Sequence, residues 1–185
     1  FILYTLAGSA LLLVMVIAFR MEGGSFSIPA LMAKSYSVNF QRWMFLIMAL
    51  AFAVKVPLFP FHTWLPAAYV QAPIAGSILL SAVMAKMGAY GFLRLALPLV
   101  PDAAHFFSPL IIAMSVCSIL YGGFLAFAQS NLKKIIAYSS LGHMGFVVLG
   151  IFLFNLNGAQ GALIQMVNHG ITTGALFAMA GIFYQ

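Results

Sequence analysis

Charged residues are scarce in this 185-residue sequence, and cysteine is almost absent. Only 5% of the residues are charged and the mean hydropathy is +1.11, whereas soluble domains contain about 25% charged residues. The single cysteine, Cys117, excludes a disulfide framework and a cysteine-rich metal site, and its apolar surroundings are typical of a packing residue. The eight lysines and arginines are scattered, so they form no nucleic-acid-binding patch. These shortages indicate an integral membrane protein.

Long apolar runs divide the chain into membrane spans. The hydrocarbon core of a bilayer is about 30 Å thick and requires about 20 apolar residues per helix. Polar and Pro/Gly clusters then separate six spans, which we place at residues 1–19, 41–70, 73–97, 109–128, 132–154 and 158–184. The runs lack the alternation of transmembrane strands, so we expect an all-α polytopic bundle.

The two ends of the chain lie inside hydrophobic runs. The sequence opens with Phe1-Ile-Leu-Tyr4 and stops at Gly181-Ile-Phe-Tyr-Gln185, before any closing loop. We therefore interpret residues 1–185 as a single transmembrane domain that is a fragment of a longer polypeptide. The first run has no basic region typical of a cleavable signal peptide.

The second span contains helix breakers beside a lysine. In Ala53-Val-Lys-Val-Pro-Leu-Phe-Pro60, Pro57 cannot donate to the carbonyl of Ala53, and Pro60 cannot donate to that of Val56. We predict two half-helices that meet near Lys55. Carbonyls freed inside a membrane need partners from neighbouring protein or water, so the break should face other helices.

Titratable groups stand near the centres of four spans: Lys55, Lys86, His143 and His169. A lysine costs about 2.5 kcal/mol or more at mid-membrane and is by default functional, whereas a lone histidine on an apolar helix is more often a packing residue. A lysine exchanges protons only if its pKa, ordinarily about 10.4, is brought toward neutrality. We expect these four side chains to point to the interior at similar depth and to be linked through water, Ser139 and Thr173.

The other histidines are less informative. His62 lies near the break, beside Trp64, and is either an accessory polar residue or an interfacial capping residue. His105 is placed in a loop. No second histidine or carboxylate stands at metal-ligand spacing, so we expect no metal site.

Three segments of the chain, taken with the two lysines thirty-one residues apart, carry a family resemblance. They are KVPLFPFHTWLPAAYVQAPIAGSILLSAVMAKMGAYGFLR from Lys55, NLKKIIAYSSLGHMGFVVLG from Asn131, and GALIQMVNHGITTGALF from Gly161. They resemble the antiporter-like membrane subunits of respiratory complex I, an NADH:quinone oxidoreductase, and most closely its chain M type, mitochondrial subunit four. Multisubunit cation/proton antiporters and membrane-bound hydrogenases share the same core, so those parent complexes remain alternatives.

The resemblance implies a fourteen-helix protein with two inverted five-helix repeats, each built around a broken helix. It assigns proton-relay roles to Lys55, Lys86, His143 and His169, and it places the partner glutamate outside this chain. It further implies that this chain binds no redox cofactor and is coupled to quinone reduction elsewhere in the complex. The protein is expected to work with other membrane subunits in a bacterial inner membrane or in an energy-transducing organelle membrane.

Two positions depart from the family pattern. Where relatives commonly have an aspartate and a glutamate after the broken helix, this chain has Ala67 and Gln71.

One alternative function of a different class remains, which is a structural membrane scaffold whose polar residues merely pack helices. The orientation is also open, because basic side chains favour one side by a margin of two, while the resemblance places Lys133 and Lys134 in the cytoplasm.

Overall fold

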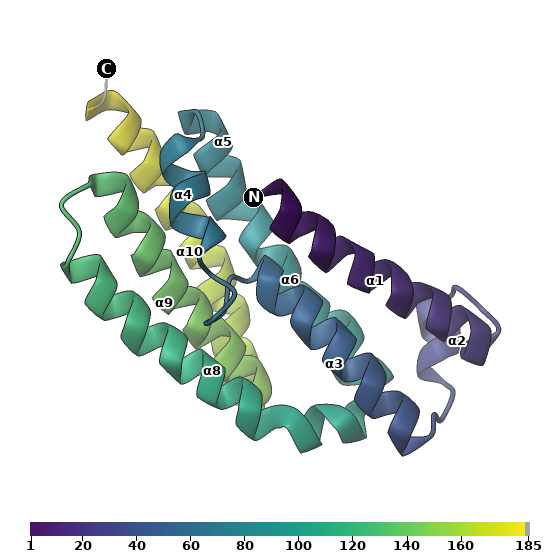
Figure 1. The fold of residues 1–185 in the computed structure, drawn as a ribbon. Coiled ribbons are helices and arrows are strands. Elements are labelled where there is room, and N and C mark those ends of the chain that lie inside the picture. Colours follow the sequence, from purple (N-terminus) through teal and green to yellow (C-terminus); the bar gives the residue numbers. More distant parts are fainter. Residues whose placement is uncertain (184–185) are drawn as a thin grey trace.

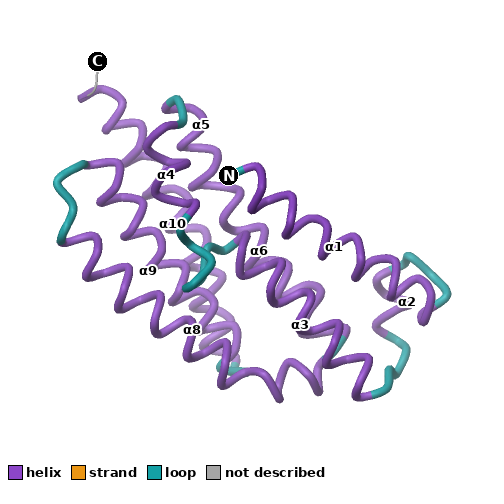
Figure 2. The backbone as a smooth tube through the Cα atoms, viewed as in Figure 1, coloured by secondary structure: helices purple, strands orange, loops and turns teal. Residues whose placement is uncertain are grey.

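Helices make up all of the regular structure in the part of the chain that is described. A computed structural model describes residues 1–183, and Figures 1 and 2 show its helices packed as a bundle. Six helices are long and apolar enough to cross a membrane: α1 (Ile2–Gly23), α3 (Val38–Lys55), the continuous helix Ile74–Leu99, α8 (Pro101–Phe127), α9 (Leu132–Phe152) and α10 (Leu156–Phe183). The predicted all-α membrane bundle is confirmed.

Local sequence signals set several helix ends. Ser37 caps α3 by accepting the N–H of Phe40 at 3.4 Å, and Asn131 caps α9 by accepting the N–H of Lys134 at 3.2 Å. Gly24, with φ of 74°, ends α1 in a left-handed conformation that glycine adopts without steric cost. A short helix, α2 (Ile28–Met32), follows in the first long connection.

The predicted break in the second span is confirmed. Helix α3 ends at Lys55, residues 56–63 form turns, and the chain resumes as α4 (Trp64–Gln71). The end of the sixth predicted span, at Tyr184, lies outside the described residues. Ala67 and Gln71 are both exposed on α4.

The predicted loop over residues 98–108 is wrong for most of its length. Helix α8 already begins at Pro101, because a proline is tolerated at the first helical position and Asp102 favours the first turn. Pro109 lies inside the helix and cannot donate to the carbonyl of His105. The hydroxyl of Ser108 donates to that carbonyl instead, at 2.9 Å, so the helix continues.

The third span is a composite helix. It consists of α5 (Ile74–Leu79), a π-helical turn η1 (Leu80–Met84), α6 (Ala85–Gly91), a second π-helical turn η2 (Phe92–Ala96) and α7 (Leu97–Leu99). The apolar run predicted one span here, but no residue pattern in it indicated the π turns.

Glycines bring the backbones of α8, α9 and α10 close together. A Cβ atom added at Gly145 would lie 2.9 Å from the carbonyl oxygen of Ser115, and one added at Gly150 would lie 2.7 Å from that of Gly158. Small residues at these crossings allow membrane helices to pack without a large side chain between them. Helix α9 therefore lies between α8 and α10, while α1 packs against α3 at the other edge of the bundle (Figure 1).

The buried apolar side chains form two clusters, and the break connects them. Phe45, Met48 and Phe52 of α3 belong to a larger cluster with side chains of α6, α8 and α9. Trp64 and Tyr69 of α4 belong to a second cluster with α9 and α10. The turns at residues 56–63 thus carry the chain from one packing group to the other.

Candidate functional site

The break beside Lys55 is satisfied by protein groups. The Leu58 N–H donates to the carbonyl of Ala53 at 2.9 Å, which replaces the bond that Pro57 cannot make. The indole N–H of Trp64 donates to the carbonyl of Val54 at 3.0 Å. These bonds hold the half-helices together around the interruption.

Helix α8 supplies a further partner to the break. The Phe59 N–H donates to Ser118 Oγ at 2.8 Å, and Pro57 and Leu58 are buried. The predicted contact of the break with neighbouring helices is confirmed. Pro60 differs, because it is exposed and lines an apolar groove between α3 and α8.

Lys86 is buried and makes two short hydrogen bonds. It is 9% exposed, and its Nζ lies 2.5 Å from the carbonyl oxygen of Ser81 and 2.5 Å from Nδ1 of His169 on α10. The π turn η1 makes the first bond possible. The N–H of Ala85 bonds the carbonyl of Leu80, whereas in an α-helix it would bond that of Ser81. The Ser81 carbonyl is left for the lysine.

A glycine on α10 lets that helix approach Lys86. A Cβ atom added at Gly170 would lie 3.2 Å from the carbonyl oxygen of Ala82 and 3.8 Å from Cε of Lys86. The neighbouring His169 is 3% exposed and has no hydrogen-bond partner at Nε2 among the described residues. The lysine and the imidazole therefore meet in a tight contact between two membrane helices.

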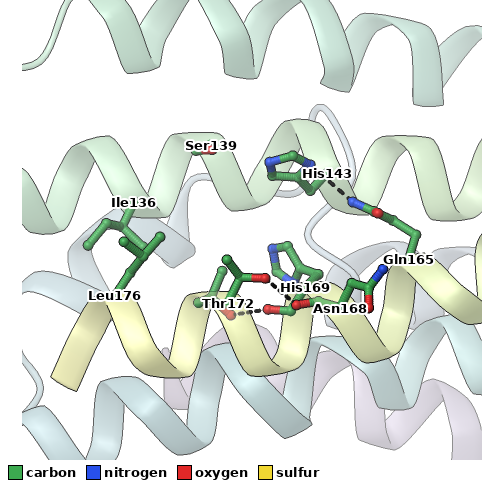
Figure 3. Close-up of a pocket in the computed structure, with 9 residues that line it drawn as sticks. Ile136, Ser139, His143, Gln165, Asn168, His169, Thr172 and Leu176 are labelled. Atoms are coloured by element: carbon green, nitrogen blue, oxygen red, sulfur yellow. Dashed lines mark hydrogen bonds between the residues drawn. The ribbon is translucent and has the colours of Figure 1, made fainter. Parts of the chain in front are cut away.

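The second histidine stands across a cavity from the first. The rings of His143, on α9, and His169, on α10, have centroids 5.6 Å apart, and Figure 3 shows them facing each other. Gln165 Nε2 lies 3.1 Å from Nδ1 of His143. The cavity between them has a volume of about 200 Å³ and is lined by Ile136, Ser139, His143, Gln165, Asn168, His169, Thr172, Thr173 and Leu176. Lys86 and His169 thus form one hydrogen-bonded pair and Gln165 and His143 a second, and the two imidazoles face each other without a direct hydrogen bond.

The two predicted linking hydroxyls differ in their contacts. Thr173 is buried, and its Oγ1 donates to the carbonyl of His169 at 2.5 Å, within its own helix. Ser139 lines the cavity beside His143. Asn168 and Thr172 were not predicted as part of the site. The sequence does contain a pattern that indicates them. Asn168 and Thr172 are three and seven residues after Gln165, so the three polar side chains share one face of α10.

His143 is more exposed than expected. Its mid-span position predicted that it faces the interior, but its side chain is exposed on the surface of the described helices. The reason is the packing of α9, whose buried face is formed by neighbours such as Gly142 and Met144. His143 instead lies at the edge of that face, over the cavity.

Lys55 is not in contact with the other three residues. It is half-buried at the end of α3, and within residues 1–183 it makes no hydrogen bond or ion pair. A Cβ atom added at Gly88 would lie 3.0 Å from Cβ of Lys55, so α6 presents Gly88 to α3. Two residues rotate a helix by about 200°, so Lys86 and Gly88 lie on opposite sides of α6. Helix α6 therefore separates the two lysines.

His62 lies in an aromatic environment away from the two hydrogen-bonded pairs. It is 5% exposed, stacks on Phe59 with ring centroids 5.8 Å apart, and meets the ring of Tyr121 at 5.1 Å. Its Nδ1 has no partner among the described residues. Its contacts are those of a packing residue at the break.

Comparisons with known proteins agree on the family. The sequence matches, over residues 1–185, the family described as NADH:quinone oxidoreductase/Mrp antiporter, transmembrane. It is 44% identical over 197 residues to NADH-quinone oxidoreductase subunit M of Rhodobacter capsulatus, covering 100% of this chain and 38% of that protein.

Solved structures show the same fold. A chain in the structure of respiratory complex I from Thermus thermophilus with bound NADH matches with a TM-score of 0.93 and 37% identity, covering 99% of this chain and 40% of that one. A chain of the Mrp complex from a Dietzia species matches with a TM-score of 0.88 and 28% identity, covering 98% of this chain and 20% of that one. This chain spans less than half the length of each of these proteins. Because sequence and fold agree along its whole length, the chain belongs to the NADH:quinone oxidoreductase/Mrp antiporter transmembrane family.

Proposed function

We propose that this chain is part of a proton-translocating membrane subunit of an NADH:quinone oxidoreductase. The observation that carries the proposal is the contact of Lys86 Nζ with Nδ1 of His169, at 2.5 Å, between two helices that span the membrane. A buried cation at this depth is costly and is by default functional. Its partner is a side chain that can both accept and release a proton.

The proton path that we propose runs from Lys86 through His169 to His143. The ammonium donates to Nδ1 of His169, and the imidazole then carries its other proton on Nε2, which is buried and has no protein partner among the described residues. Release of that proton requires the ring to turn toward the cavity of about 200 Å³, which is large enough for water molecules that reach His143. The amide of Gln165 then holds the His143 ring through Nδ1.

Lys55 takes part on the other side of α6. Because it has no hydrogen-bond partner within residues 1–183, proton exchange with Lys86 requires intervening water. Pro57 and Pro60 support this step by interrupting the helix beside the lysine, His62 supports it by packing against that interruption, and Ser139 and Thr173 are accessory polar residues. The partner carboxylate of the relay belongs to a part of the protein outside residues 1–185.

Electron transfer takes place elsewhere in the complex that we propose. This chain holds no redox centre or other cofactor in the proposal, so NADH oxidation and quinone reduction are carried out by other subunits. Residues 1–185 form one transmembrane piece of a fourteen-helix protein whose partners are membrane subunits and the lipid bilayer.

The similarity to the Mrp complex, with a TM-score of 0.88, favours a cation/proton antiporter subunit as the second candidate. Purification of the complex from its native membrane separates the two candidates. Subunits that oxidise NADH and carry iron–sulfur clusters support the oxidoreductase, whereas a complex of membrane subunits alone supports the antiporter.

Proton flux in reconstituted vesicles tests the relay itself. Lys55→Ala and Lys86→Ala should each lower the flux and leave the content of assembled subunit unchanged. Lys134→Ala is the matched control, because Lys134 is exposed in the first turn of α9. Normal flux in the Lys86→Ala variant would contradict the relay.

A further inference from the structure

An apolar groove lies between α3 and α8, on the opposite side of α3 from α1. It has a volume of about 400 Å³ and extends down to the break. The lining residues used below are Phe45, Leu50, Ala53, Phe61, Phe107 and Met114. None of them belongs to the series formed by Lys86, His169 and His143.

A cation stands near the end of the groove that lies toward the start of α3. The guanidinium of Arg42 lies over the ring of Phe106, 4.3 Å from its centroid. Phe106 meets Phe107 with centroids 4.9 Å apart, and Phe107 stacks on Phe45 at 5.4 Å. The aromatic contacts therefore lead from the cation directly into the apolar lining.

The charge of Arg42 is not neutralised by an acid within residues 1–183. The acid on the neighbouring helix is Asp102, and it accepts a hydrogen bond from Gln41 at 2.9 Å and forms no ion pair with Arg42. Arg42 is exposed in the first turns of α3. It is therefore free to bind an anion at the membrane surface.

The groove and the cation together match the depth of one leaflet of a bilayer. The α3 lining from Phe45 to Ala53 is about 12 Å long. Arg42 precedes Phe45 by three residues, so Arg42 and Ala53 are about 16 Å apart along the helix. The hydrocarbon core is about 30 Å thick, so one leaflet is about 15 Å deep. A transmembrane helix would need a contact surface across both leaflets, whereas the groove ends at the break. An acyl chain fits this length.

We propose that this groove binds one acyl chain of an anionic phospholipid, with the phosphate bound by Arg42. The chain lies along α3 and α8, and its end contacts Phe61 and Met114 beside the break. Leu50 is 39% exposed and forms part of the wall that the chain covers.

Photo-crosslinking of the full-length subunit in its parent complex tests this site. Phosphatidylglycerol with a photoreactive group near the end of one acyl chain is compared with phosphatidylcholine that carries the same chain. The adduct should map to peptides containing Phe61 or Met114. One basic side chain near an anionic headgroup should favour the phosphatidylglycerol probe by about fivefold.

Two substitutions separate the headgroup from the chain. Arg42→Ala should remove the fivefold preference, whereas Arg20→Ala should retain it, because Arg20, on α1, lies over the ring of Phe26 and not beside this groove. Leu50→Trp should fill the groove and reduce adducts from both probes. Leu120→Trp, at an exposed position of α8 outside the lining, should not.

Several results would overturn the proposal. One is equal labelling by the two probes, which indicates unselective boundary lipid. Another is labelling that persists in the Leu50→Trp variant. A third is protein density from another segment or subunit in the groove of the whole complex. Assembly of each variant is verified by subunit content, so a loss of labelling is not mistaken for misfolding.

Discussion

Replacement of Lys86 by methionine separates proton transfer from helix packing. Methionine retains an unbranched side chain but removes the ammonium. The carbonyl of Ser81 and Nδ1 of His169 then lose their donor, and each unsatisfied buried group costs about 1–3 kcal/mol. Removal of a lysine from the centre of a membrane helix returns about 2.5–3.5 kcal/mol. The two effects nearly cancel, so the variant should assemble with little change in thermal stability.

The effect on proton transfer has no such compensation. Loss of a positioned proton donor slows a transfer step by about 10²–10⁴-fold. Lys86→Arg should be similarly impaired, because a guanidinium keeps its proton at physiological pH.

Proteoliposomes that contain the intact complex and a pH-sensitive dye provide the assay. Proton flux and NADH:quinone turnover are measured together with the content of assembled subunit. Normal flux in the methionine and arginine variants would refute the relay. Normal flux in the arginine variant, with loss of assembly in the methionine variant, would instead identify Lys86 as a structural charge.

Three further predictions concern packing and positioning. Gly88→Ala should destabilise the protein by about 1–3 kcal/mol, because the added Cβ would lie 2.9 Å from the carbonyl oxygen of Phe52 on α3. Gly123→Ala is the control, because its added Cβ would meet no atom within 4 Å. Thermal unfolding in detergent compares the two variants. Ser118→Ala should lower the unfolding midpoint by leaving the part-buried N–H of Phe59 at the break without an acceptor, whereas Ser115→Ala loses only a bond within its own helix and should be nearly neutral. Gln165→Leu should reduce proton flux while leaving the unfolding midpoint nearly unchanged; unaltered flux would remove Gln165 from the site.

The sequence was sufficient to predict the spans and the break. Apolar runs fix where helices cross a membrane, and Pro57 and Pro60 remove N–H groups that a continuous helix needs. The predicted loop before Pro109 failed because proline also begins helices, and because the hydroxyl of Ser108 takes over the bond to the free carbonyl. Such a replacement depends on a side-chain rotamer that no residue pattern reveals.

The candidate site was predicted only in its residue types. Mid-span position identified Lys86, His169 and His143, which the structure brings together. It did not separate Lys55 from them, because the angular position of two lysines on different helices depends on how those helices pack. The exposure of His143 has the same origin, since one helix face is buried against α8 and its edge is left over the cavity.

The π turn η1 also sets the rotation of the helix beyond it. A π turn holds about one more residue per turn than an α-helix, so each of its residues turns the chain less. If the same residues were wound as a regular α-helix, at about 100° per residue, the helix beyond them would be rotated further, and Lys86 would turn away from the imidazole of His169 with every side chain of the pair unchanged. The winding of Leu80–Met84 therefore determines whether the ammonium meets the imidazole.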